Sequence, residues 1–127
     1  HSVNLSNDGK VYVLDRPSNR IQVFTREGKF IAEKIVAPET IRMGSVWDLT
    51  FSPDPEQNWL FIADGANMKV WVLKRDGLEI VDSFGRGGRQ AGQFNWIHAI
   101  SSDTKGNLYT GEVWNGKRVQ KFQTIPN

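Results

Sequence analysis

Three segments of the chain repeat one pattern of apolar and polar residues, and this repetition constrains the fold more than any other feature. The segments are HSVNLSNDGKVYVLDRPSNRIQVF (1–24), DLTFSPDPEQNWLFIADGANMKVWVL (48–73) and HAISSDTKGNLYTGEVWNGKRVQKF (98–122). Each has a short apolar run, a polar turn and a strand that ends in an acid, and a basic residue then starts another strand. The acids are Asp15, Asp64 and Glu112, and the basic residues are Arg20, Lys69 and Arg118. Repetition of this kind indicates a repeat architecture.

The period inside each repeat is that of β-structure. RIQVF (20–24) and KVWVL (69–73) alternate apolar and polar residues, as half-buried strands do. REGKFIAEKI and RDGLEIVDSF each add a glycine turn and a fourth strand, and no stretch keeps a helical period. The repeats begin 47 and 50 residues apart. A four-stranded unit of roughly 40 to 50 residues is typical of a β-propeller blade.

We therefore predict an all-β fold, a single partial propeller domain over 1–127. The blades are expected at 1–46, 47–96 and 97–127, with HSVNL, DLTFS and HAISS as the innermost strands and the third blade incomplete. Two interpretations stay open, because propellers typically have four to eight blades. Either further blades belong to a longer chain, or a homodimer closes a six-bladed ring about a two-fold axis.

Charge and composition narrow the function classes. The net charge is +2, from 16 basic and 14 acidic residues that are interspersed. A nucleic-acid-binding protein usually clusters its basic residues, so nucleic acid is not favoured as a partner. No apolar run approaches the roughly 18 residues that cross a bilayer, so no membrane partner is expected. The chain has no cysteine, which excludes disulfides and thiol chemistry.

The stretch FGRGGRQAGQFNWIHAI (84–100) closely resembles the junction between blades in NHL-repeat propellers. Its glycines are expected to shape the crossover from an outer strand to the next inner strand: Gly85, Gly87, Gly88 and Gly92. A phosphate-binding loop is excluded, because there is no Gly-Lys-Ser/Thr and no helix for the loop to enter. The resemblance implies NHL-type blades.

Among NHL propellers, the chain resembles the peptidyl-α-hydroxyglycine α-amidating lyases, which are six-bladed. In that family histidines from alternate blades hold a catalytic zinc, with an Asp on the intervening blade. His1 and His98 match the ligand positions and Asp48 matches the intervening Asp, so the resemblance implies that all three line the central channel. It also implies zinc as a cofactor, calcium as a second possible one, and a secreted or periplasmic location. Zinc takes about four N, O or S ligands, so converging imidazoles suit it.

The chain departs from that family at three places. Ile97 replaces the proline before the ligand histidine, and Ala66 stands where the family has its catalytic tyrosine. Arg16, in VLDRPSN, resembles the family's substrate-binding arginine, but in a blade where the family does not use it. In a competing interpretation, His98 forms a structural hydrogen bond with a carbonyl or with Asp48.

Two functions follow from these observations. The first is a binding or scaffold module with a polar central channel that takes a peptide or a small polar ligand. The alternative is a zinc-dependent lyase, in which Arg16 is the candidate catalytic residue and His1 and His98 hold the metal. The tryptophans are expected to pack mostly between blades, with Trp96 and Trp114 as candidates for exposed aromatic surface.

Overall fold

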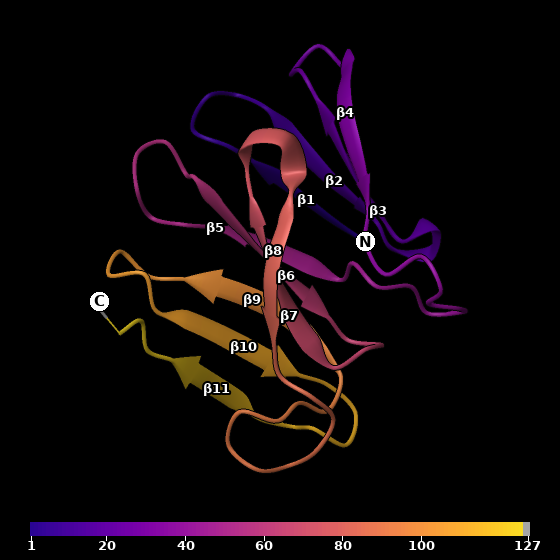
Figure 1. Ribbon diagram of the computed structural model, residues 1–127, viewed down its shortest axis with the longest axis vertical. Coiled ribbons are helices and arrows are strands. Elements are labelled where there is room, and N and C mark those ends of the chain that lie inside the picture. Colours follow the sequence, from indigo (N-terminus) through magenta and orange to yellow (C-terminus); the bar gives the residue numbers. More distant parts are fainter. Residues whose placement is uncertain (126–127) are drawn as a thin grey trace.

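The chain, in a computed structural model that describes residues 1–125, forms three antiparallel sheets (Figure 1). The first contains β1 (Ser2–Leu5), β2 (Val11–Asp15), β3 (Arg20–Phe24) and β4 (Phe30–Ile35). The second contains β5 (Asp48–Phe51), β6 (Trp59–Asp64), β7 (Lys69–Lys74) and β8 (Ile80–Phe84). The third contains β9 (Ile97–Ser102), β10 (Leu108–Glu112) and β11 (Val119–Phe122).

Each sheet is a meander, because every strand pairs with its successor in the sequence. Tight turns make this possible: Gly9, with φ of +81°, and Gly106, with φ of +85°, occupy the left-handed region between the first two strands of their sheets. Among residues 1–125 the helical elements are two single-turn 3₁₀ segments, Arg16–Ser18 and Asp76–Leu78. None of the described helices has the length and apolar character of a membrane span. The predicted all-β fold of partial propeller blades is confirmed.

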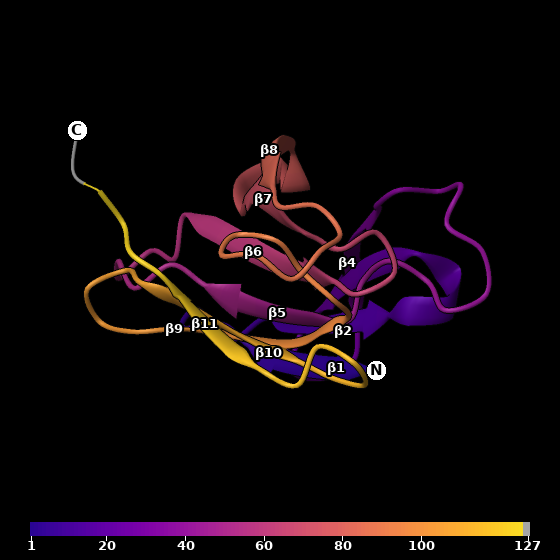
Figure 2. The same ribbon diagram turned by 90° about the horizontal axis from the view of Figure 1, so that it is seen from below.

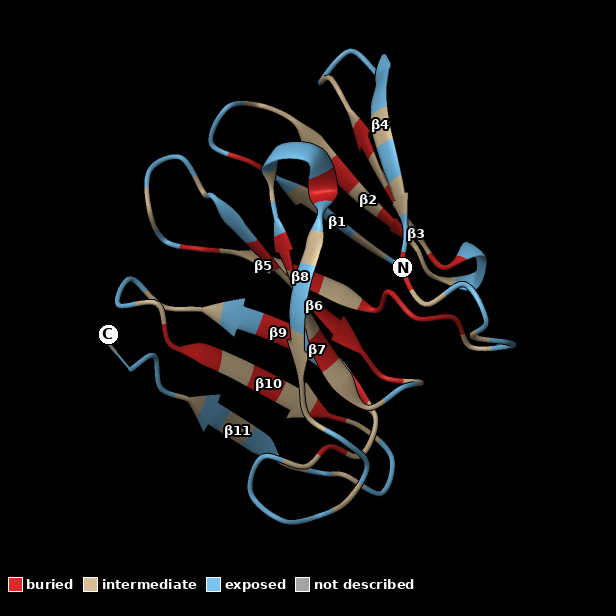
Figure 3. Cartoon of the chain, viewed as in Figure 1, coloured by how far each residue is buried: buried red, intermediate tan, exposed pale blue. Residues whose placement is uncertain are grey.

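The three sheets are arranged as adjacent blades. Strand β5 lies between β1 and β9 and contacts both, whereas β7 and β8 rise away from this inner layer (Figures 1 and 2). The predicted inner strands are thus the observed ones. Two cores fill the spaces between blades, and Figure 3 shows the buried residues concentrated in β2, β6 and β10. The core between the first two blades includes Tyr12, Leu14, Ile21, Leu49, Leu60 and Ile62. The core between the last two includes Val70, Phe94, Ile97 and Ile100.

The outward faces of the first and third blades carry apolar side chains that no other part of the described chain covers. Val3 is 67% exposed and Leu5 is 56% exposed, opposite Val13 and Val11 of β2. On the third blade Val119 is 74% exposed. Equivalent faces of the second blade are covered by its two neighbours, since Leu49 is buried in the first core and Val70 in the second. Each outward face therefore has the character of a blade-to-blade surface.

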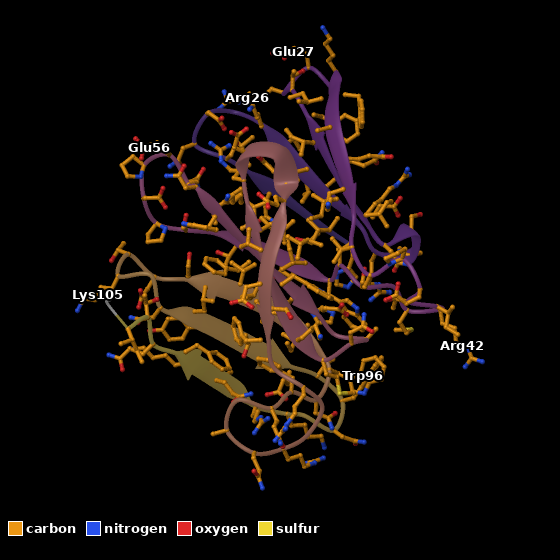
Figure 4. The ribbon with its side chains drawn as sticks, in the orientation of Figure 1. Arg26, Glu27, Arg42, Glu56, Trp96 and Lys105 are labelled. Atoms are coloured by element: carbon orange, nitrogen blue, oxygen red, sulfur yellow. The ribbon has the colours of Figure 1, made fainter. Side chains whose placement is uncertain are left out.

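One end of the blades carries the turns between the second and third strands of each sheet and the links between sheets. Because successive strands run in opposite directions, the turns 16–19, 65–68 and 113–118 and the links 36–47 and 85–96 lie at the same end. We call this end the linker face. Figure 4 shows Arg42 and Trp96 at this end, and Glu56 and Lys105 at the opposite end.

In the first and third blades the repeated acid pairs with the repeated basic residue across a turn of the linker face. Asp15 accepts a hydrogen bond from Arg20 Nε at 2.9 Å, and Glu112 accepts one from Arg118 Nε at 2.6 Å. The second blade differs. The Lys69 ammonium lies 4.9 Å from the centre of the Trp71 ring instead of pairing with the acid of its blade.

The glycine-rich link 85–96 shapes the crossover into β9, as its sequence predicts. A Cβ added to Gly85 would lie 2.2 Å from the Phe94 ring, and the φ of Gly85 is +96°. The Gly88 N–H donates to the Phe94 carbonyl at 2.9 Å. The link therefore folds back on Phe94, which is fully buried in the second core.

Candidate functional site

Two imidazoles from the first and third blades meet at the linker face. The ring centroids of His1 and His98 are 4.9 Å apart, and the Trp47 ring lies 5.7 Å from each. A hollow of about 180 Å³ lies beside them, with Asp48 and Ala99 also in its lining. The three residues expected to line a channel therefore border one hollow, which we call the inner hollow.

The strand register corrects the expected equivalence of these residues. The residues that pair with the position just before each acid are equivalent: Ser2 pairs with Leu14, Asp48 with Ala63 and Ala99 with Gly111. His1 is therefore equivalent to Trp47, and not to Asp48. The backbone hydrogen bonds support this equivalence, because His1 N donates to Leu14 O at 2.8 Å and Trp47 N donates to the equivalent Ala63 O at 2.9 Å.

His98 reaches the hollow through an irregularity in its blade. The register of β9 and β10 shifts between Gly111 and Glu112, so that Ile97 pairs with Glu112 and His98 is an extra residue. Such bulges redirect a side chain that regular pairing would point elsewhere. The bulge therefore places two residues, Ile97 and His98, at the level where the second blade has Trp47, and His98 borders the hollow.

Asp48 ties the three inner strands together. Its Oδ1 accepts a hydrogen bond from Ser2 Oγ at 2.8 Å, and its Oδ2 accepts one from the Ile100 N–H at 2.9 Å. One carboxylate on β5 thereby holds both β1 and β9. In the described contacts Asp48 accepts no hydrogen bond from an imidazole, so its structural role here is to fix the spacing of the blades.

The nitrogen atoms of His1 have different partners. Its Nδ1 lies 2.6 Å from the carbonyl oxygen of Trp47, which can only accept, so Nδ1–H donates and Nε2 of the neutral ring is left as an acceptor. Metal-binding histidines are commonly oriented by such a bond from the other ring nitrogen. Among residues 1–125, however, no three His, Cys, Asp or Glu side chains gather closely enough to hold a metal ion. The described residues thus offer two imidazoles and no complete ligand set.

Arg16 lies beneath Trp47. Its guanidinium carbon is 4.5 Å from the centre of the Trp47 ring, within the range of a cation–π contact. Its Nε is buried and has no hydrogen-bond partner among the described residues. The backbone of Arg16 also packs closely against that of Gly44, because a Cβ added to Gly44 would lie 1.7 Å from the Arg16 carbonyl oxygen. The structure therefore places this candidate catalytic residue against an aromatic ring.

Trp47 is the centre of this arrangement, and sequence reasoning assigned it only to packing. It is 1% exposed, and its Nε1–H donates to Gly44 O at 2.9 Å. Trp96 and Trp114 lie 5.9 Å and 6.2 Å from it. No count along the sequence identifies it, because Trp47 lies 17 residues before Asp64 whereas His1 lies 14 before Asp15; only the strand pairing shows that the two are equivalent.

A buried carboxylate supports the neighbouring turn. Asp64 accepts hydrogen bonds from Asn67 N at 2.9 Å and from Trp71 Nε1 at 2.9 Å. Burial raises the pKa of Asp64, whereas these N–H donors act to lower it. The bonds hold the turn 65–68, which carries Ala66, at the linker face.

Comparison with known proteins supports the fold. No known sequence-family profile matches this chain. Virginiamycin B lyase from Staphylococcus aureus superposes with a TM-score of 0.65 at 18% identity, over 100% of this chain and 41% of the enzyme. Its catalytically inactive form with quinupristin gives 0.62 at 14% identity, over 96% and 40%. The β-propeller domain of Swd1 from Myceliophteria thermophila gives 0.71 at 10% identity, over 98% and 40%.

These likenesses define the class of protein. The chain is built as a β-propeller module, and it spans about two fifths of the length of each structure it resembles. At such low identity the likeness concerns the fold, and function has to be argued from the site.

Proposed function

We propose that this chain contributes NHL-type blades to a β-propeller binding module, whose inner hollow takes a small polar ligand or the end of a peptide. The observation that carries this proposal is the meeting of His1 and His98 beside Asp48, from three successive blades. Imidazoles supply both a donor and an acceptor, and Trp47 gives the hollow an apolar wall. Few polar groups on an apolar wall are typical of ligand sites.

The zinc-dependent lyase is the second candidate, and one observation favours it. The bond of His1 to the Trp47 carbonyl leaves Nε2 available, as in an oriented metal ligand. His1 and His98 would supply two protein ligands, whereas catalytic zinc sites typically use three. A third ligand would have to come from beyond the described residues. Bound zinc would supply a Lewis acid that lowers the pKa of its water.

Two further features bear on the lyase. Ala66 has no group for acid–base catalysis where the resembled family has a tyrosine. The Arg16 guanidinium packs on Trp47, so substrate contact would use the groups of its outer edge. These points make the binding module the better-supported function.

We also propose that the outward faces of the first and third blades are covered by other blades, from a longer chain or from a second copy that closes a six-bladed ring. The exposed Val3, Leu5 and Val119 support this proposal. Apolar surfaces of that kind mark interfaces. Light scattering tests the second copy: a dimer mass supports ring closure, and a monodisperse monomer contradicts it.

The function is tested by nuclear magnetic resonance on ¹⁵N-labelled chain. A panel of free amino acids and short peptide amides is expected to shift the amide signals of Ser2, Ala99 and Ile100. The variant His98→Ala removes one of the two imidazoles from the lining of the hollow, and should weaken those shifts. Shifts confined to the opposite end of the blades would contradict the binding proposal.

Zinc is tested by calorimetric titration of the same protein. Binding that is lost in His1→Ala and in His98→Ala, and retained in Glu56→Gln at the opposite end, supports the lyase alternative. Neutral imidazole binds metal, so occupancy should fall below about pH 6. Equal zinc binding by the wild type and both histidine variants would remove the lyase alternative and leave the binding module.

A further inference from the structure

Two tryptophans at the linker face hold backbone conformations that large side chains rarely adopt. The φ of Trp96 is +58° and that of Trp114 is +51°. For bulky residues such values are outliers that persist only where the surroundings impose them. One restraint is visible, because the Val113 N–H donates to the Trp96 carbonyl at 3.0 Å. Strain at two neighbouring tryptophans points to a function for their side chains.

The two indoles form a corner. Their centroids are 4.7 Å apart and their planes meet at 79°. Trp114 is 54% exposed, so this pair does not serve mainly as core. Within the described contacts neither indole N–H has a protein acceptor. The pair therefore presents aromatic surface at the linker face, beside the inner hollow but outside its lining.

The corner borders a second hollow of about 590 Å³, which we call the side hollow. Its other apolar walls are Ile41, Met43 and Ala66. Its polar lining includes Thr40 and Asn67, which are joined by a 2.8 Å hydrogen bond from Asn67 Nδ2 to Thr40 Oγ1. These two polar side chains are already paired with each other, so that part of the side hollow offers mainly aromatic and aliphatic surface.

Charge at the side hollow favours a cation. The Glu39 carboxylate lines it and has no ion pair or hydrogen bond among the described contacts. Arg42 is the one basic residue in the described lining, and Figure 4 shows its side chain at the outer tip of its loop, directed away from Trp96. Indole faces carry negative electrostatic potential and attract alkylammonium ions. A carboxylate near two indoles at right angles therefore complements a positive charge that carries apolar groups.

We propose that the side hollow binds an alkylammonium group, a methylated or quaternary amine, against Trp96 and Trp114 with Glu39 as the counter-charge. The site is separate from the inner hollow and does not depend on the ligand proposed there. His98→Ala should therefore leave this binding unchanged, and failure of one proposal leaves the other standing.

The experiment uses choline as the probe and follows the five indole N–H signals of the ¹⁵N-labelled chain. The comparison ligand is the neutral analogue in which a tert-butyl group replaces the trimethylammonium group, at equal ionic strength. Choline should shift the signals of Trp96 and Trp114 and leave that of Trp59 in place. It should bind about tenfold more tightly than its neutral analogue, as a desolvated cation–π contact allows.

Three variants test the named residues. Trp114→Ala should weaken choline binding about tenfold and Trp114→Phe less, because a smaller π face remains. Glu39→Gln should weaken it severalfold, whereas the matched control Glu56→Gln at the opposite end should not. Equal binding of choline and its neutral analogue would overturn the proposal, as would shifts at Trp59 that match those at Trp96.

Discussion

The replacement of Trp47 by alanine gives the sharpest test of how the linker face is built. Trp47 is 1% exposed and contacts both imidazoles, and the Arg16 guanidinium packs on its ring. Truncation of a buried tryptophan to alanine typically costs about 3–5 kcal/mol. The truncation also removes the hydrogen bond from the indole N–H to the buried Gly44 carbonyl, and that loss is included in this range. We therefore expect Trp47→Ala to lower the free energy of unfolding by about 4 kcal/mol.

A milder variant separates the two contributions. Trp47→Phe keeps most of the ring but leaves the Gly44 carbonyl without its donor, which costs about 1–2 kcal/mol. Urea unfolding followed by far-ultraviolet circular dichroism measures both variants, because that signal reports mainly the backbone, whereas the substitution itself would change tryptophan fluorescence. Trp59, which is 38% exposed, supplies the control, and Trp59→Ala should cost less than about 1 kcal/mol. Equal losses for Trp47→Ala and Trp59→Ala would refute the reasoning.

Three further predictions concern the blades themselves. Arg118→Met removes the cation paired with the Glu112 carboxylate, whose side chain is 0% exposed, and leaves it, among the described contacts, only the hydrogen bonds from Asn95 N and Gln120 Nε2. Urea unfolding should show a loss of about 3 kcal/mol, and a loss below about 1 kcal/mol would contradict this. Gly44→Ala adds a Cβ that collides with the Arg16 backbone, at a φ of +76°, so the melting temperature of the variant should fall by several degrees. An unchanged melting temperature would show that the loop can change conformation at no cost. The hydrogen bond from Arg75 lowers the pKa of Asp8 to about 2, so the stability from this bond is present above about pH 4 and is lost as the pH falls towards 2. The effect is small because the Asp8 side chain is 42% exposed, and Asp8→Asn should remove that part of the acid dependence of urea midpoints.

The fold was predictable because its signals are local. Alternation at period two identified RIQVF and KVWVL, which are β3 and the start of β7. Glycine turns and the recurring acids placed the hairpins between them. These patterns act over a few residues, so they survive even where the blades differ in sequence.

The register of the site was not predictable from the first polar residue of each repeat. That alignment placed His1, Asp48 and His98 at one position, whereas backbone pairing makes Ser2, Asp48 and Ala99 equivalent. The error arises because the first hairpin of the second blade is longer: Asp48 lies 16 residues before Asp64, whereas His1 and His98 lie 14 residues before Asp15 and Glu112. An alignment that starts at the first polar residue of each repeat does not detect this difference in length.

Contacts between distant segments were equally hidden. Arg16 and Trp47 are 31 positions apart, and nothing local shows that one packs on the other. Lys69 follows the pattern of Arg20 and Arg118, yet it lies over the Trp71 ring because the indole N–H occupies the acid of that blade. Which partner an acid takes depends on the side chains of the neighbouring strand.

The distance between the two imidazoles tests the central claim most directly. If three blades converge at the linker face, the ring protons of His1 and His98 lie close enough for nuclear Overhauser effects, since their centroids are 4.9 Å apart. We predict cross-peaks between the two imidazoles and from each of them to the Trp47 indole. Cross-peaks from Trp47 to Trp96 without any from His1 to His98 would show that the first and third blades do not meet there, and would contradict the site as described.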